Sequence, residues 1–112
     1  MALQTRFLVP LVSNDGQSFP ESKFDELETQ IILQLGGFQK ESEIKGGWKA
    51  DDGRLMTDAA LTPYRVTVFD IPILWKLYQF LQRICTDFQQ EALYLEVSNH
   101  VELVYPQQQG GA

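Results

Sequence analysis

The sequence predicts an α+β domain with a ferredoxin-like β-α-β-β-α-β antiparallel sheet, two helices on one face of that sheet, and an extra C-terminal hairpin strand. Two segments repeat apolar residues with the 3.6-residue period of a helix. Several shorter segments alternate apolar and polar residues, as half-buried strands do. The order of these segments along the chain is that of the split β-α-β arrangement.

Length and composition favour one hydrophobic core. The chain has 112 residues, of which 44% are apolar and 21% are charged. A chain of this length buries roughly two thirds of the surface that its unfolded form exposes, which is enough to fold without disulfides or a structural metal. We predict one α+β domain over residues 1–106. Residues 107–112, Gln-Gln-Gln-Gly-Gly-Ala, have no strand or helix period and predict a flexible tail.

The first predicted strand is Phe7–Val12, a continuous apolar run that ends at the turn sequence Ser13-Asn14-Asp15-Gly16. Such a run is typical of a strand that is buried on both faces. Pro10 is unusual there, because proline lacks the N–H group of a strand ladder and normally lies at a sheet edge or a bulge.

The first predicted helix begins in the sequence Ser18-Phe19-Pro20-Glu21, with Ser18 as a hydroxyl cap and a proline in the first turn. Four apolar residues lie on one stripe of this helix: Phe24, Leu27, Ile31 and Leu35. The pair Gly36-Gly37 predicts the end of the helix, because glycine readily adopts the left-handed cap conformation.

The middle of the chain predicts a hairpin and a third strand. Glu43–Lys49 alternates as a strand, and Asp51-Asp52-Gly53 is a turn signal that reverses the chain. Arg54–Thr57 then pairs back as a short hairpin strand. We predict a loop over Asp58–Pro63 and a strand over Tyr64–Phe69, where the alternation is strict.

The second predicted helix begins at the cap Asp70, with Pro72 in its first turn, and runs to about Gln90. Its apolar arc is wider than a surface helix needs, which predicts deep packing. Trp75 lies on the opposite, polar side and is the most conspicuous candidate for an exposed aromatic residue. Two alternating strands, Leu93–Val97 and Val101–Tyr105, follow with a turn between them.

The segment Gly47–Leu55, Gly-Trp-Lys-Ala-Asp-Asp-Gly-Arg-Leu, resembles a family of small uncharacterised bacterial proteins in which a tryptophan strand, a glycine turn and an apolar strand follow one another. The resemblance spans Phe7 to Tyr105 and implies a ferredoxin-like fold. Members of that family are often exported lipoproteins, whereas this sequence shows neither a signal segment nor a lipidation cysteine near its start. The family has no assigned catalytic residue, so none is carried over.

Charge and cysteine content restrict the partners and the compartment. Fifteen acidic residues against nine basic ones give a formal charge of −6, which repels nucleic acid and anionic lipid. The apolar run Phe7–Val12 is too short for a signal core or a membrane span. A single cysteine, Cys85, excludes an internal disulfide and fits a reducing cytoplasm. We therefore expect a cytoplasmic protein that binds neither nucleic acid nor membranes.

No catalytic motif occurs in the sequence. The one histidine, His100, excludes two-histidine metal motifs, and Asp51-Asp52-Gly53 lacks the alternating oxygen ligands of a calcium loop. Nucleophile elbows, phosphate loops and dinucleotide fingerprints are missing as well. Cys85 lies on the apolar side of its helix, where a thiol is inert. The sequence predicts no catalytic residue, no metal and no cofactor.

Two groups of residues are candidates for binding. If the fold forms a pocket, its rim is predicted to include Trp48, Arg54, Asp58, Tyr64 and His100. A candidate interface lies on the second helix, where Ile71 and Tyr78 flank Trp75 by one turn on either side. Exposed apolar patches of this kind often mark interaction sites, although a covering loop is the alternative.

These observations favour a non-enzymatic, homodimeric interaction or regulatory module, in which a second copy covers the bare face of the sheet. The alternative is a small dimeric α+β barrel-type enzyme that acts on a small organic molecule in an apolar cavity. The partners expected are a second copy of the chain and either a small apolar ligand or another protein.

Overall fold

The computed structural model describes residues 2–107, apart from the side chains of Trp48, Asp58 and Ala59. Helices and strands follow one another in the order β1 (Leu3–Pro10), α1 (Glu21–Leu35), β2 (Gln39–Lys40), β3 (Ile44–Lys49), β4 (Leu55–Val68), α2 (Ile71–Asp87), β5 (Leu93–Val97) and β6 (His100–Val104). The predicted α+β class, with two helices and an antiparallel sheet, is confirmed. The predicted β-α-β-β-α-β order is not matched, because an additional short strand, β2, precedes β3.

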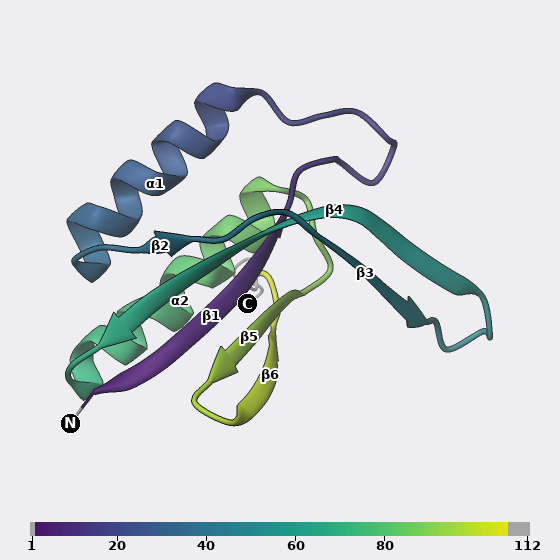
Figure 1. Cartoon of the computed structure of the whole chain (residues 1–112). Helices are drawn as coiled ribbons and strands as arrows, with labels where there is room; N and C mark the ends of the chain where they lie inside the picture. Colours follow the sequence, from purple (N-terminus) through teal and green to yellow (C-terminus); the bar gives the residue numbers. More distant parts are fainter. Residues whose placement is uncertain (1, 108–112) are drawn as a thin grey trace, which may run out of the picture.

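All pairings in the sheet are antiparallel, and its strand order is β2-β4-β1-β5-β6, with β3 also paired to β4 (Figure 1). The central strand β1 places Phe7 opposite Tyr64 of β4 and opposite Leu95 of β5. The β6 strand forms one edge of the sheet. At the other side, the ribbon of β3 and the first half of β4 extends away from the helices (Figure 1).

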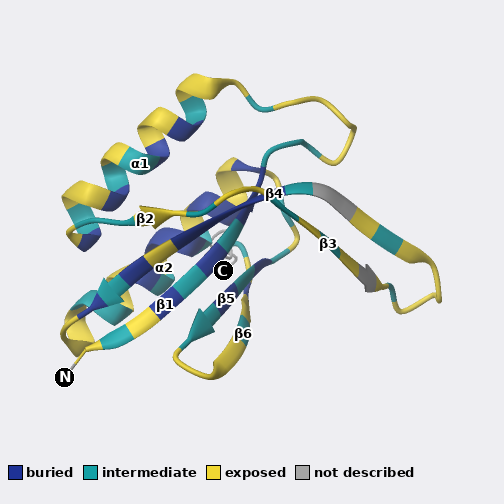
Figure 2. Ribbon diagram, in the orientation of Figure 1, coloured by how far each residue is buried: buried dark blue, intermediate teal, exposed yellow. Residues whose placement is uncertain are grey.

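One cluster of buried side chains joins both helices to the sheet. Alternate residues of the strands enter it, as the dark bands along β1 and β4 show (Figure 2). The sheet supplies Phe7, Val9, Tyr64, Val66, Val68, Leu93, Leu95 and Val104 to this core. Because neighbouring residues of a strand point to opposite faces, the intervening residues, such as Arg6 and Glu96, lie on the outer face of the sheet.

The first strand differs from its prediction in position and pattern. It spans Leu3–Pro10 rather than Phe7–Val12, and its burial alternates, so it is not buried equally on both faces. Pro10 fits in a central strand for a simple reason. Strand β5 pairs only with Thr5 to Phe7 of β1, so the side on which Pro10 lacks its N–H has no ladder partner to lose.

The predicted loop Asp58–Pro63 is wrong, because β4 runs without a break from Leu55 to Val68. The local sequence of this stretch favours a loop, and only its pairing with other strands makes it extended. In the fold, β3 pairs with its first half and β1 with its second half. Pro63 lies opposite Leu8 of β1, and its carbonyl accepts a hydrogen bond from the Glu41 N–H at 3.0 Å.

The first helix begins later than its sequence signal indicates. Pro20 is the N-cap residue and no side chain caps it, so the predicted hydroxyl cap at Ser18 is wrong. The predicted stripe is confirmed, since Phe24, Leu27, Ile31 and Leu35 are all buried. Gly36 ends the helix with φ of 97°, in the left-handed conformation that glycine adopts without steric cost.

The second helix is capped as predicted: the Asp70 side chain accepts a hydrogen bond from the Ile73 N–H at 2.8 Å. It ends at Asp87, earlier than the predicted Gln90. Trp75 is exposed, as its position on the helix predicted. Strand β5 has the predicted bounds, and β6 spans His100–Val104 instead of the predicted Val101–Tyr105, so that His100 begins the strand instead of closing the turn.

Candidate functional site

A glutamate at the edge of the sheet joins the second helix to the last strand. The Tyr78 hydroxyl of α2 donates a hydrogen bond to Glu102 Oε2 on β6. The other carboxylate oxygen, Oε1, lies 3.1 Å from His100 Nε2. One residue from each predicted group, Tyr78 from the interface and His100 from the pocket, therefore meets at Glu102, which the sequence analysis did not single out.

The positions of these residues follow from strand and helix geometry. Glu102 is two residues before buried Val104 in β6, so both side chains lie on the same face of the sheet, toward α2. Glu102 is nearer the start of the strand than Val104 and is only half-buried. Burial is the largest cause that raises the pKa of Tyr78 to about 12, and the hydrogen bond to Glu102 and its negative charge add to it. At neutral pH the phenol is therefore a hydrogen-bond donor, and its hydrogen bond fixes the orientation of the carboxylate.

An exposed aromatic surface adjoins Tyr78, the residue that donates to this carboxylate. The ring of Trp75 is 6.3 Å from that of Tyr78, centroid to centroid, and the rings are inclined at 49°. Trp75 is 65% exposed and Ile71, one turn earlier on α2, is 50% exposed. A partly exposed carboxylate beside aromatic rings is equipped to bind a ligand and to accept a proton from it. We call Trp75, Tyr78, His100 and Glu102 the α2/β6 site.

Of the predicted pocket residues, Tyr64, Arg54 and His100 are not brought together. Tyr64 is buried in the core, where its hydroxyl donates to Glu28 Oε2 of α1 at 2.7 Å. Arg54 lies in the exposed turn between β3 and β4 and pairs with Asp52 at 2.6 Å. His100 is on β6, and β1 and β5 separate that strand from β4. The side chains of Trp48 and Asp58 lie outside the described residues.

Lys40 of β2 completes a second polar cluster around Tyr64. Its Nζ lies 3.0 Å from Glu28 Oε2 and 5.7 Å from the centre of the Tyr64 ring. Burial, followed by the hydrogen bond and the charge of Glu28, raises the pKa of Tyr64 well above its ordinary value. This cluster ties β2 to α1 through groups that satisfy one another, and we assign it to stability.

A third cluster occupies the outer face of the sheet. Arg6 of β1 contacts Glu41 at 2.9 Å and Glu96 of β5 at 3.3 Å, while Arg65 of β4 contacts Glu41 at 2.8 Å. Hydrogen bonds from Arg65 and Arg6 hold the pKa of Glu41 below its ordinary value. The sequence does not predict this network, because Arg6 lies before the first predicted strand and Glu41 lies outside every predicted element.

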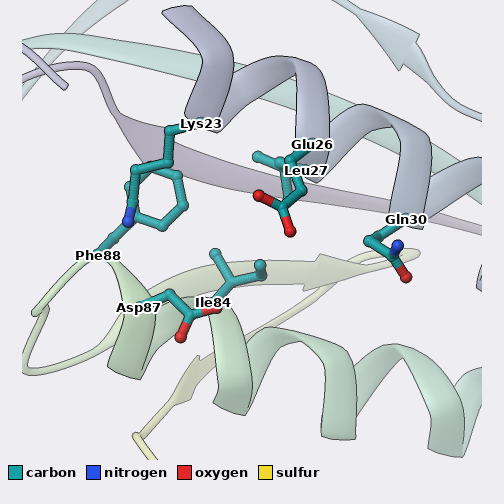
Figure 3. A pocket seen from close by; sticks show the side chains of 7 residues that line it. All are labelled: Lys23, Glu26, Leu27, Gln30, Ile84, Asp87 and Phe88. Atoms are coloured by element: carbon teal, nitrogen blue, oxygen red, sulfur yellow. The ribbon is translucent and has the colours of Figure 1, made fainter. Parts of the chain in front are cut away.

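A shallow crevice of about 110 Å³ lies between α1 and α2 (Figure 3). It is lined by Lys23, Glu26, Leu27, Gln30, Ile84, Asp87 and Phe88. The ammonium group of Lys23 lies 4.9 Å from the centre of the Phe88 ring. With four polar side chains at its wall, this crevice differs from the enclosed apolar cavity expected of a barrel-type enzyme.

Within residues 2–107, no group of three or more histidine, cysteine, aspartate or glutamate side chains is placed to hold a metal ion. Neither α1 nor α2 is long and apolar enough to cross a membrane.

Neither a family model nor a curated protein matches the chain. Solved structures do match in fold. A phage SAM lyase in complex with S-methyl-5'-thioadenosine is 14% identical, with a TM-score of 0.68 over 97% of this chain and 93% of the lyase. The same description, phage SAM lyase, applies to an apo structure with a TM-score of 0.62 and 14% identity, over 96% of this chain and 92% of that one. The divalent cation tolerance protein CutA1 of Thermus thermophilus is 10% identical, with a TM-score of 0.52 over 100% of this chain and 88% of that chain.

These neighbours correct the sequence-based view of function. The prediction of a non-enzymatic interaction or regulatory module is contradicted, because the same fold, over nearly the full length of both chains, is that of a lyase. The alternative, a small enzyme that acts on an organic molecule, is better supported. The resemblance to small uncharacterised bacterial proteins stays an expectation, and what the solved structures support is its coarser part, a small α+β fold.

Proposed function

We propose that this chain is an enzyme that acts on a small sulfonium nucleoside of the S-adenosylmethionine kind and breaks a carbon–sulfur bond in it. The observation that carries the proposal is the match to the SAM lyase bound to S-methyl-5'-thioadenosine, which extends over 97% of this chain and 93% of the lyase. At 14% identity the match concerns the fold, so the residues of this chain must supply the remaining support.

The α2/β6 site offers the groups that such a ligand requires. A sulfonium nucleoside carries a positive charge on sulfur and a flat adenine ring. The Glu102 carboxylate and the exposed aromatic face of Trp75 both complement the charge on sulfur. Tyr78 holds the carboxylate through a hydrogen bond from α2, so the charged group is fixed before the ligand arrives.

Cleavage of the carbon–sulfur bond requires no cofactor. The bond between sulfur and the first carbon of the aminobutyryl chain breaks, and its electron pair goes to sulfur, which becomes the neutral thioether of S-methyl-5'-thioadenosine. As that bond breaks, the carboxylate oxygen of the same chain attacks the carbon from the side opposite sulfur, which gives a lactone. In the competing elimination, Glu102 removes a proton from the neighbouring carbon and an unsaturated amino acid forms. The second product distinguishes these two routes.

The test is to incubate the purified full chain with S-adenosylmethionine and to measure S-methyl-5'-thioadenosine by liquid chromatography and mass spectrometry. We expect its formation above the rate without protein, and loss of that formation in Glu102→Gln. Glu43→Gln is the matched control, since Glu43 is exposed beside β3, on the opposite side of the sheet from β6. A folded wild-type chain that releases no thioadenosine would overturn the proposal.

We further infer that the fold is the ferredoxin-like arrangement, with both helices on one face and with β2 and β3 sharing the place of a single strand. Support comes from the sheet order, in which β1 and β4 are central neighbours, and from the core to which both helices contribute. Comparison of an experimental structure with ferredoxin-like domains tests this inference.

The homodimer stays a prediction. The outer face of the sheet carries the ion pairs of Arg6 and Arg65, and a second copy stacked there would have to bury them at a cost. The exposed apolar residues Val101, Leu103 and Tyr105 lie at the β6 edge instead. The solution mass, measured by sedimentation, decides whether the chain is a dimer.

A further inference from the structure

We propose that Trp75, Tyr78 and Glu102 form a recognition site for organic cations with a methylated sulfonium or ammonium centre. The inference rests on the proposed function only for naming the natural ligand as a sulfonium. The site itself is argued from exposure, ring geometry and charge in this chain.

The aromatic part of the site is exposed on α2. Tryptophan has the largest apolar side chain, yet Trp75 is 65% exposed, on a stripe that continues through Ile71 and Tyr78 at helical spacing. The Trp75 and Tyr78 rings are 6.3 Å apart and inclined at 49°, so they are not stacked on one another. The Tyr78 ring therefore does not cover the exposed indole in a parallel stack, and the exposed, electron-rich face of an indole attracts a cation.

The polar part of the site is negative and fixed. Glu102 receives the Tyr78 hydroxyl on one oxygen and lies 3.1 Å from His100 Nε2 on the other. Neither Lys nor Arg makes an ion pair with Glu102 among the described residues, in contrast to Glu28, Glu41 and Glu96. The carboxylate therefore retains negative charge that an incoming cation can neutralise.

The chemistry selects a methylated organic cation over the other ligand classes. A hard metal ion requires several oxygen ligands, and this site has one carboxylate. An anion is repelled by Glu102 and by the net charge of −6. A sulfonium or quaternary ammonium is weakly hydrated, so it loses little by leaving water for an aromatic surface, and it gains attraction to both rings and to the carboxylate.

The test uses choline and its neutral carbon isostere, 3,3-dimethyl-1-butanol, as matched probes of equal shape. Each is titrated into the full chain while the indole N–H resonances are followed by NMR. We expect choline to shift one indole resonance, which Trp75→Leu removes from the spectrum, and the neutral isostere to have no such effect. Equal shifts with both probes would contradict cation recognition.

Three variants locate the site. Trp75→Leu and Glu102→Gln should each weaken choline binding by about tenfold, as followed on the backbone amide resonances, which remain in the spectrum when the indole is removed. Tyr105→Leu, which removes another exposed aromatic residue, should leave binding unchanged. The far-UV and near-UV circular dichroism of each variant checks that the fold is intact. Unchanged choline affinity in folded Trp75→Leu would overturn the inference. So would a Trp75 resonance that responds to protein concentration but not to choline, because a second copy would then be the occupant.

The failure of this inference can be told apart from the failure of the proposed function. Choline binding that depends on Trp75 and Glu102, in a chain that does not cleave S-adenosylmethionine, supports the cation site and contradicts the enzyme. Cleavage of S-adenosylmethionine by Trp75→Leu with an unchanged KM contradicts the cation site and leaves the enzyme standing.

Discussion

The α2/β6 site and the outer-face network are both built around glutamates, but they differ in what neutralises the carboxylate. Glu41 of the outer face lies between two guanidinium groups, of Arg6 and Arg65. Glu102 has a phenol on one side and the imidazole of His100 on the other. A carboxylate held by permanent cations is an element of structure. Glu102 contacts no guanidinium or ammonium group among the described residues, so its oxygens are the ones that a cationic ligand can approach.

The largest effect should come from neutralising one glutamate of each cluster in turn. Glu102→Gln removes the charge and the proton acceptor of the α2/β6 site, so we expect turnover of S-adenosylmethionine to fall by roughly 10²-fold or more. Glu41→Gln should leave turnover within about twofold of wild type, since Glu41 lies on the outer face of the sheet. Steady-state kinetics with mass-spectrometric detection measures both. If Glu41→Gln is the variant that loses activity, the roles of the two clusters are reversed.

The buried cluster around Tyr64 should show the next largest effect, on stability alone. Tyr64→Phe keeps the packing of the ring in the core and removes the hydroxyl that donates to Glu28 at 2.7 Å. We expect a loss of about 1.5 to 3 kcal/mol in the free energy of unfolding, because a hydrogen bond to a charged group contributes this much. Urea denaturation measures it. A stability equal to wild type would show that Lys40 alone satisfies Glu28.

How far the sequence predicts these clusters depends on whether each partner lies on a recognisable element. Both helices and the strands β5 and β6 follow from local periodicity, and Asp70 was correctly identified as a cap. The exposure of Trp75 followed from the same wheel. By contrast, β4 was divided into a strand, a loop and a strand, because only its pairing with β1 and β3 makes residues 58–63 extended.

The site residues show the same limit. Tyr78 and His100 were each named in advance, but in different groups, since no local pattern reports that α2 crosses beside β6. Glu102 alternates with apolar neighbours and looked like a solvated strand residue. Tyr64 was placed at a pocket rim, whereas its register opposite Phe7 carries it into the core. Long-range pairing determines each of these outcomes.

Acid should abolish the stabilisation that Glu41 provides on the outer face of the sheet. Because Arg65 and Arg6 hold the pKa of Glu41 below its ordinary value of 4.5, the stabilisation that Glu41 provides is complete above that pH. It is lost as pH falls through the lowered pKa of the folded state. We expect the difference in unfolding free energy between wild type and Glu41→Gln to be constant from neutral pH down to about 5 and to shrink below 4.5. A difference that persists undiminished at about pH 3 would contradict this account of the outer face.

Alkali should report on the α2/β6 site in the opposite direction. The pKa of Tyr78 is raised to about 12 from the ordinary value of 10.0, so the unfolded chain loses this proton first. The corresponding stability is intact below about pH 10 and declines as pH rises through about 12. Replacing Glu102 by Gln removes its charge and should lower the pKa of Tyr78, although burial, the largest cause, remains. Absorbance at the tyrosinate band, with Tyr78→Phe to assign the step, measures the titration.

The smallest effect on stability is expected from Trp75, although it is one of the residues proposed to bind the ligand. Trp75 is mostly exposed and contributes to α2 chiefly through its contact with Tyr78, so Trp75→Leu should change the free energy of unfolding by no more than about 0.5 kcal/mol. Leucine is also the better helix former, which offsets part of the lost contact. Thermal and urea unfolding of the variant measure this difference. A loss of several kcal/mol would mean that the indole is packed against the rest of the chain or against a second copy. The contrast between the α2/β6 site, which binds a ligand, and the outer face of the sheet, which stabilises the fold, would then no longer hold.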